Sequence, residues 1–342
     1  MTYVVLLLVA LVGVALIPSH HQRTWGQELA IQGNPHFVSV SCTSSHFCAL
    51  AGYSTTAGEL VDGKYHSQLI SGAESPAGFN PNNVLNPSLQ GIGVNYISCP
   101  ASQQCLATSS DGELVLDYEG KWIAKRAVGV SSTEGLEGVS CTVDFFCVLG
   151  TDSGNAFFFD RHHWIPVGSP LQPQTGGINA VACPTNFVCY VATALLDVPT
   201  GEESSGRIFT YTSSGWESSS PTISDAITTI SCPSENFCMA GTNGDNYLYF
   251  ADGAWTDPMP ITQSQSRISS GEWIASVSCT DSFHCTALAT DGNIYQWNGL
   301  IWTSAGEVST QVQAFVGSDS ISCYFKFSCV VVGNGIWIHH QN

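Results

Sequence analysis

Two features of the sequence predict an all-β fold, a seven-bladed β-propeller built from four-stranded antiparallel blades. The first is the motif Cys-x5-Cys, which occurs seven times and accounts for all fourteen cysteines: Cys42 and Cys48, Cys99 and Cys105, Cys141 and Cys147, Cys183 and Cys189, Cys232 and Cys238, Cys279 and Cys285, and Cys323 and Cys329. Successive copies begin 57, 42, 42, 49, 47 and 44 residues apart, which is the usual length of a propeller blade. The second is the composition of the intervening segments, such as residues 112–118 and 293–297, which are short, aromatic and β-branched. Helical repeats would instead place apolar residues three and four positions apart.

Every unit is predicted to contain the same elements in the same order. The first strand ends in Val or Ile, then Ser, then the first cysteine, except that the fourth unit has Ala182 in place of Ser. The second strand starts at the second cysteine, an aromatic third strand follows a Gly, Asp or Asn turn, and the fourth strand opens with an aromatic residue. Because these aromatic residues recur in every unit, we expect them to pack between blades: Tyr65, Trp122, Trp164, Trp216, Trp255, Trp302 and Trp25.

The two chain ends are predicted to complete one blade together. The seventh unit reaches Asn342 without its fourth-strand aromatic residue, and Trp25, ahead of the first unit, supplies it. Residues 22–31 and 318–342 are therefore expected to share blade 7 of a single propeller that spans 20–342. This closure would leave no free sheet edge.

The cysteine pairs are predicted to be disulfides, one in each blade. A five-residue hairpin loop brings its flanking residues opposite each other, within bridging distance. Each bridge would contribute about 2 kcal/mol by restricting the unfolded chain. Zinc is the competing interpretation, but it needs four ligands around one ion, and cysteine pairs in separate blades cannot supply four.

Residues 1–19 are predicted to be a signal peptide or a short membrane anchor. Their apolar run, 4–17, is too short for a comfortable membrane span and fits the hydrophobic region of a signal peptide. An uncleaved anchor and a buried structural segment remain as alternatives, because no Lys or Arg precedes the run. Since disulfides persist in oxidising compartments, the chain is expected to be secreted or anchored at the extracellular surface.

The charge balance excludes whole classes of partner. The net charge is −18, from 27 acidic and only 9 basic residues. A basic surface for nucleic acid or for an anionic membrane therefore cannot be assembled. Contact with a membrane is expected only through the N-terminal apolar segment, if that segment is uncleaved.

The repeated unit Ile/Val-Ser-Cys-x5-Cys-x-Ala, followed by a Gly-rich turn and a Trp-bearing hairpin, resembles the repeats of secreted bacterial β-propellers that carry one disulfide per blade. Such chains are similar to sialidase-like and WD-repeat-like propellers. The resemblance covers residues 22–342 and implies the fold only. Sialidase activity is not implied, because the Asp-box Ser-x-Asp-x-Gly-x-Thr-Trp is absent. Sialidases also bind the substrate carboxylate with three arginines, whereas four of the five arginines of this chain are expected in fourth strands, their adjoining turns or the N-terminal seam.

Loop lengths distinguish the two predicted faces of the propeller. The loops within the cysteine motifs are uniform, and the insertions, at 71–92, 195–205 and 263–272, belong to loop classes that emerge on the opposite face. We call these the disulfide face and the insertion face. Variable loops on a rigid scaffold usually carry binding. The candidate ligand-binding residues stand where the first strands enter from the insertion face: Trp273, His36, Asn95, Tyr96 and Asn179.

Trp273 is the most distinctive of these candidates. Four other blades have Gly at the equivalent position. Its ring could stack on a sugar or a peptide, or it could simply fill the mouth of the channel.

Catalytic chemistry has one weak pair of candidates. Glu137 and Asp319 could act as the two carboxylates of a glycoside hydrolase or lyase. Nucleophile-elbow, phosphate-loop and His-Glu-x-x-His motifs are absent from the sequence. Three His-His pairs, 20–21, 162–163 and 339–340, are interpreted as solvated side chains. We expect no cofactor and no metal, and enzyme activity stays uncertain, with a non-enzyme favoured.

The sequence thus favours an extracellular binding or scaffold module that recognises a carbohydrate or protein ligand on the insertion face. One alternative is a glycoside hydrolase or lyase that uses the two carboxylates at the channel mouth. The other is a structural component of the cell envelope or of an extracellular polymer.

Overall fold

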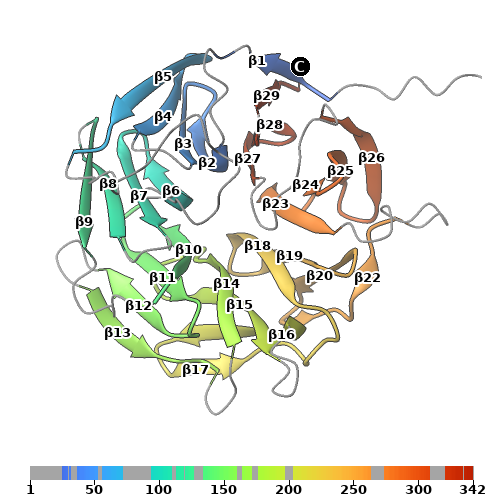
Figure 1. The fold of residues 1–342 in the computed structure, drawn as a ribbon. Coiled ribbons are helices and arrows are strands. Elements are labelled where there is room, and N and C mark those ends of the chain that lie inside the picture. The colour runs from blue at the N-terminus through green and yellow to red at the C-terminus, as the bar shows by residue number, and fades with distance from the viewer. Residues whose placement is uncertain are drawn as a thin grey trace, which may run out of the picture.

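The computed structural model describes residues 25–29, 31, 37–52, 56–71, 94–109, 113–118, 120–126, 134–159, 164–171, 176–196, 203–262, 273–308, 320–333 and 335–341. Within these ranges the secondary structure consists of strands and turns, and no helix long and apolar enough to cross a membrane occurs. Seven antiparallel sheets stand around a central channel, which confirms the predicted seven-bladed β-propeller (Figure 1).

Blades 1 to 3 each contain four strands that pair in chain order, from the channel outwards (Figure 1). Their bounds are β2 (Phe37–Ser44), β3 (Phe47–Gly52), β4 (Thr56–Val61) and β5 (Lys64–Leu69) in blade 1; β6 (Val94–Ala101), β7 (Gln104–Ser109), β8 (Glu113–Tyr118) and β9 (Lys121–Arg126) in blade 2; and β10 (Leu136–Cys141), β11 (Cys147–Thr151), β12 (Ala156–Phe159) and β13 (Trp164–Gly168) in blade 3.

Blades 4 to 6 follow the same order, and the outer strand of blade 5 is divided into two short pieces. Their bounds are β14 (Gly176–Ala182), β15 (Cys189–Leu196), β16 (Glu203–Thr212) and β17 (Gly215–Ser218) in blade 4; β18 (Ile227–Ser234), β19 (Phe237–Thr242), β20 (Asn246–Ala251), β21 (Ala254–Trp255) and β22 (Met259–Pro260) in blade 5; and β23 (Ile274–Asp281), β24 (His284–Ala289), β25 (Asn293–Trp297) and β26 (Trp302–Glu307) in blade 6.

Blade 7 joins the two ends of the chain, as predicted. It contains β27 (Ser320–Phe325), β28 (Ser328–Val332), β29 (Ile336–His339) and, as its outer strand, β1 (Gln27–Leu29). Trp25 does not open this strand but lies two residues before it, and Gly26, with φ of +70°, turns the chain between them. The Trp25 ring stacks on His339 with ring centres 5.1 Å apart, and its amide donates to the Glu307 carbonyl at 2.7 Å, so it ties blade 7 to blade 6.

All seven predicted disulfides are present, with 4.0 to 4.1 Å between the paired Cα atoms, and no cysteine is free. The zinc alternative is therefore wrong. The five intervening residues are not a simple loop in most blades. In five blades the ladder continues past the cysteines and closes with a pair such as Ser44 with Phe47 or Asp281 with His284. The register shifts on the way, so a β-bulge absorbs the extra residue.

The apolar core is divided among the boundaries between neighbouring blades, which we call seams. Seven clusters of buried side chains each join two consecutive blades, including blade 7 and blade 1. Each of the seven recurring aromatic residues belongs to one of these clusters or packs against it, as expected from their repetition. The largest fully buried examples are Trp25 and Trp122.

A ring of side-chain hydrogen bonds also crosses the seams. At the residue before the first cysteine, here called the belt position, the Ser hydroxyl accepts the amide hydrogen of the first cysteine in the next blade at 2.9 to 3.0 Å. The acceptors are Ser41, Ser98, Ser140, Ser231, Ser278 and Ser322. Ala182 occupies the belt position of blade 4, so the seam between blades 4 and 5 lacks this bond.

Candidate functional site

A cavity of about 590 Å³ occupies the central channel. It is lined by the first strands of all seven blades and by the segments that lead into them. Pockets of 300–1,000 Å³ are the usual size of ligand sites. Four residues selected from the sequence line this one cavity, although they come from four different blades: Tyr96, Glu137, Asn179 and Trp273.

One ring of positions controls the width of the channel. Three residues before the first cysteine, at what we call the wall position, the seven blades have Ser39, Tyr96, Gly138, Ala180, Thr229, Ser276 and Ser320. Three of these hydroxyls accept an amide hydrogen from the next blade: Ser39 from Ile97, Thr229 from Val277 and Ser276 from Ile321, at 3.1 to 3.2 Å. Tyr96 is the only large side chain at this level.

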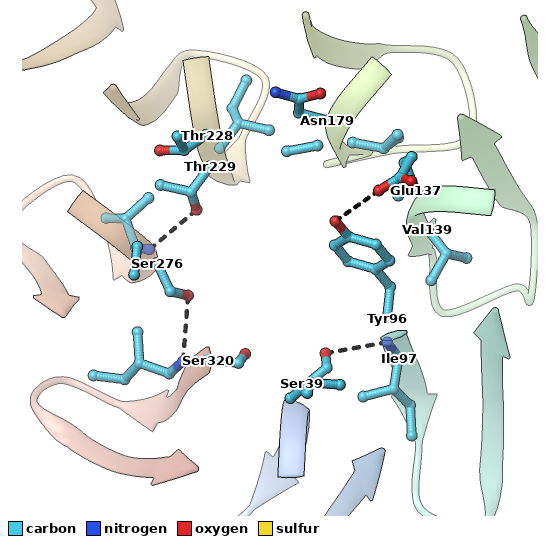
Figure 2. A pocket seen from close by; sticks show the side chains of 18 of the residues that line it. Ser39, Tyr96, Ile97, Glu137, Val139, Asn179, Thr228, Thr229, Ser276 and Ser320 are labelled. Atoms are coloured by element: carbon cyan, nitrogen blue, oxygen red, sulfur yellow. Dashed lines mark hydrogen bonds between the residues drawn. The ribbon is translucent and has the colours of Figure 1, made fainter. Parts of the chain in front are cut away.

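Among the labelled residues of Figure 2, Tyr96 and Glu137 are joined by a hydrogen bond between two side chains of neighbouring blades. The Tyr96 hydroxyl donates to Glu137 Oε2 at 3.1 Å. Figure 2 shows the Tyr96 ring projecting into the open centre, with the carboxylate beside it. The pairing places a carboxylate and an aromatic ring on the same stretch of wall.

Asn179 and Trp273 occupy other parts of the wall. Asn179 donates its side-chain amide to the Ile227 carbonyl at 3.2 Å, so it links blade 4 to blade 5. Trp273 is half-buried, and its backbone is fixed by Thr290, whose hydroxyl accepts from the Trp273 amide at 3.1 Å and whose amide donates to the Trp273 carbonyl at 3.0 Å. The backbone that carries the Trp273 indole is thus hydrogen-bonded to the residue that follows β24.

Three candidates from the sequence cannot be placed. His36 and Asp319 lie outside the described residues, and so does the side chain of Asn95, although its backbone is part of β6. The separation of Glu137 and Asp319, on which a glycosidase mechanism would depend, is therefore untested. Most of the predicted insertions, residues 72–93, 197–202 and 263–272, also lie outside the described residues.

Carboxylates hold two turns of the insertion face. Glu134 Oε1 accepts from Ser153 Oγ at 2.6 Å and from Asn155 Nδ2 at 2.5 Å. Asp225 Oδ2 accepts from Asn246 Nδ2 at 2.8 Å. In both cases the segment that enters one blade fastens the turn between that blade's second and third strands, so this part of the insertion face is preformed.

A second group of carboxylates is buried away from the channel, at the seam between blades 1 and 2. Glu59 accepts a hydrogen bond from Trp122 Nε1 at 2.8 Å, and Asp117 is 1% exposed. Burial, together with the charge of Glu59, raises the pKa of Asp117 to about 6 against the opposing effect of the amides of Gly120 and Lys121. Neither Asp117 oxygen makes a hydrogen bond of regular geometry. Because burial disfavours the charged form, ionising Asp117 costs the folded protein free energy.

Histidines gather at the seam between blades 7 and 1, around a cavity of about 280 Å³ on the disulfide face. His46 Nδ1 lies 2.7 Å from Asp62 Oδ1, and His340 Nδ1 lies 2.7 Å from the Tyr324 hydroxyl. Burial and the neighbouring His340 lower the pKa of His339. Within the described ranges, no group of three or more His, Cys, Asp or Glu side chains is arranged to hold a metal ion.

The comparisons with known proteins agree on the fold. No protein-family model and no curated protein sequence matches this chain. Several solved structures do. U3-55K matches with a TM-score of 0.66 and 8% identity over 92% of this chain and 98% of its own. YCF48 bound to a D1 peptide matches with a TM-score of 0.61 and 11% identity over 94% and 98%. The WD40 β-propeller domain of Doa1 matches with a TM-score of 0.62 and 10% identity over 93% and 97%. At such identities the likeness shows the fold alone, a seven-bladed β-propeller.

Proposed function

We propose that this protein is a binding module of an oxidising, extracellular compartment that holds a peptide segment of a partner protein at the channel mouth on the insertion face. The observation that carries the proposal is the meeting of Tyr96, Glu137, Asn179 and Trp273 at one cavity of ligand size. Blades 2, 3, 4 and 6 of one closed ring hold these residues, so the site needs no large rearrangement to form.

The chemistry of the cavity suits a peptide. Its wall offers hydroxyls, an amide, a carboxylate and two aromatic rings, spread over several blades instead of gathered at one reactive centre. An extended chain can use such spaced groups, since its backbone and alternate side chains present donors, acceptors and apolar surface at regular intervals. Among the structural neighbours, YCF48 is bound to a peptide. That neighbour supports a peptide ligand over a glycan.

The compartment follows from the cysteines. Seven disulfides, with no free thiol left, are typical of chains that fold where thiols are oxidised. The apolar residues 4–17 would serve as the export signal or as an anchor.

The test screens the oxidised full chain in parallel against random linear peptides displayed on phage and against a broad glycan array. Two variants that each remove one aromatic ring are compared. Trp273→Ala changes the channel wall, and Phe187→Ala changes a side chain that is 78% exposed in the cysteine loop of blade 4, on the disulfide face. We expect selected peptides to bind the parent and Phe187→Ala equally, and to bind Trp273→Ala at least about tenfold more weakly.

Each other outcome has a defined meaning. Peptide binding that is lost only in Phe187→Ala would move the site to the disulfide face. Selective glycan binding that is lost in Trp273→Ala would make the protein a lectin-like module. Binding of neither kind of ligand would overturn the proposed function.

A further inference from the structure

Two asparagines hold the entry of blade 5 at the channel mouth. The Asn179 side chain of blade 4 donates from Nδ2 to the Ile227 carbonyl at 3.2 Å. The Asn243 side chain, in the turn between β19 and β20, accepts the Ala226 amide hydrogen on Oδ1 at 3.0 Å. Ala226 and Ile227 are consecutive residues where β18 begins, and both asparagines line the central cavity. One short stretch of backbone therefore orients two side-chain amides of the wall.

The bond made by Asn179 belongs to the repeat, but its oxygen does not. At the equivalent place in blade 5, the Thr228 hydroxyl donates to the Ile274 carbonyl of blade 6 at 2.7 Å. Asn179 satisfies the same kind of carbonyl with its nitrogen and carries a second polar atom, Oδ1. Within the described part of the chain, Oδ1 has no hydrogen-bond partner, and it is not enclosed by the protein. Figure 2 shows the Asn179 nitrogen on the side of the Thr228 strand and the oxygen turned away from it.

Asn243 also occupies a recurring position, five residues after the second cysteine. In three blades the backbone amide there donates at 3.0 Å to the carbonyl just ahead of that blade's first strand, from Asp152, Asn243 and Thr290. Of these three side chains, that of Asn243 alone carries an NH2 group. Asn243 is exposed, and its Nδ2 donates to no residue of the described ranges. Since Oδ1 is held by the Ala226 amide, both hydrogens of Nδ2 are left for a ligand.

The two open groups are complementary to a peptide main chain. Asn179 Oδ1 is an acceptor and Asn243 Nδ2 is a donor, and every peptide unit offers the matching N–H and carbonyl, whatever its side chain is. Both amides are fixed to neighbouring backbone groups of blade 5, so their spacing is set before a ligand arrives. Trp273 borders the same stretch, because Thr228 binds the carbonyl of the residue that follows it.

We propose that Asn179 and Asn243 bind the main chain of the peptide. Asn179 accepts a peptide N–H on Oδ1, and Asn243 donates from Nδ2 to a peptide carbonyl. Main-chain hydrogen bonds supply affinity for extended segments of different sequences, and the choice of side chain is left to Trp273. This inference rests on the proposed function, since it assigns the main-chain contacts of the same cavity.

The first experiment changes Asn243 without releasing the Ala226 amide. Asn243→Asp keeps an oxygen for that amide and replaces the donor by an acceptor. The matched control is Asn298→Asp in the turn between β25 and β26, where Oδ1 likewise accepts two amides, from Leu300 and Ile301, at 3.0 Å.

Peptides selected on the parent should bind Asn243→Asp about tenfold more weakly and should bind Asn298→Asp as tightly as the parent. The loss should be the same at low and at high salt, because it comes from the lost donor and not from the new charge.

The second experiment changes the peptide. N-methylation of one residue at a time removes a main-chain donor and keeps the side chain. We expect one position at which N-methylation weakens binding to the parent about tenfold. In Asn179→Ala the acceptor is already gone, so N-methylation at that position should have little further effect. This comparison is internal to each protein, so it holds even if the lost bond to Ile227 makes Asn179→Ala less stable.

The outcomes separate this inference from the function on which it rests. Peptides that need Trp273 but bind Asn243→Asp as tightly as the parent would overturn the inference and leave the binding function standing. The same holds for an N-methylation effect that is undiminished in Asn179→Ala, or for an equal loss in Asn298→Asp. Failure of any peptide to bind the parent would overturn both.

Discussion

The seam between blades 6 and 7 and the seam between blades 4 and 5 are built from the same repeat, but they hold their blades together differently. In the first, Ser276 at the wall position and Ser278 at the belt position accept amide hydrogens from blade 7. In the second, the same two positions are Ala180 and Ala182, and the Asn179 side chain bonds across the seam instead.

The same difference divides the whole ring of wall positions into two parts. Hydroxyls at the wall position belong to blades 5, 6, 7 and 1, where three of them bind the next blade. Blades 2, 3 and 4 have no hydroxymethyl group there, and their wall carries the Tyr96 phenol beside small residues. One side of the channel is therefore joined by hydroxyl hydrogen bonds between blades, and the other side holds Tyr96 and Glu137, where the proposed ligand site lies.

The largest expected effect comes from converting the first seam into the second. In Ser276→Ala/Ser278→Ala, two amides lose their acceptors, and we expect the free energy of unfolding to fall by about 2 to 3 kcal/mol. Urea unfolding of the oxidised protein measures the loss, and amide hydrogen exchange at Ile321 and Cys323 should rise first. Ser304→Ala, on the exposed side of β26, is the control. A loss no larger than that of the control would show that water replaces these bonds at no cost.

The seam between blades 1 and 2 differs from both of these seams, because it buries the carboxyl groups of Glu59 and Asp117. The pKa of Asp117 is raised to about 6, above that of an unfolded aspartate, so the folded protein binds the proton more tightly. Its contribution to stability is therefore greatest at or below about pH 4 and is lost as the pH rises through about 6. We therefore compare the free energy of unfolding of Asp117→Asn with that of the parent at two pH values. The variant's advantage over the parent should be about 2 kcal/mol larger at pH 7.5 than at pH 4. Parallel pH profiles of the two proteins would contradict the assigned shift.

Adding the missing hydroxyl should strengthen the weaker seam. In Ala182→Ser the new side chain occupies the belt position that Ser fills in the six other blades, next to the amide of Cys232. We expect a gain of about 1 kcal/mol in unfolding free energy. Ala254→Ser, at the exposed first residue of β21 in blade 5, should change nothing. A destabilised Ala182→Ser would mean that blade 4 sits too close to blade 5 to admit the hydroxyl.

The smallest effect on stability should come from Tyr96→Phe. The lost hydrogen bond joins two side chains at the water-accessible channel, so we expect a change below about 0.5 kcal/mol. Urea unfolding of Tyr96→Phe and of the single variant Ser276→Ala gives the contrast directly. If Tyr96→Phe were as destabilising as Ser276→Ala, the wall of blade 2 would be structural, and its assignment to ligand binding would lose its basis.

The sequence was sufficient for the parts of the molecule that repeat. The spacing of the cysteines predicts the disulfides because the paired residues are close along the chain, and the displaced Trp25 predicts the shared blade because every other unit accounts for its aromatic residue. The convergence of Tyr96 and Trp273 on the channel was also predictable from their places in the repeat. Tyr96 lies three residues before the first cysteine of its blade, and Trp273 lies six residues before that of its own blade.

Contacts between blades were harder to predict. The Tyr96–Glu137 bond and the Glu59–Asp117 pair join residues 41 and 58 positions apart, and their pairing depends on how neighbouring sheets are rotated. The role of the belt hydroxyls was missed, although a signal existed. Serine recurs at the belt position of six units, and a polar side chain that recurs inside the fold indicates a recurring hydrogen-bond partner. That partner is the amide of the first cysteine in the next blade.

The pairing of β1 with β29 sets an order for biogenesis. Among the described strands, β1 is synthesised first and its partner β29 is synthesised last. The ring therefore cannot close until β29 has been made. Each disulfide, by contrast, links residues six positions apart and can form inside its own hairpin as soon as that hairpin reaches an oxidant. The hairpins can therefore be cross-linked one at a time, and closure of the ring becomes a final step that joins blades whose disulfides are already made.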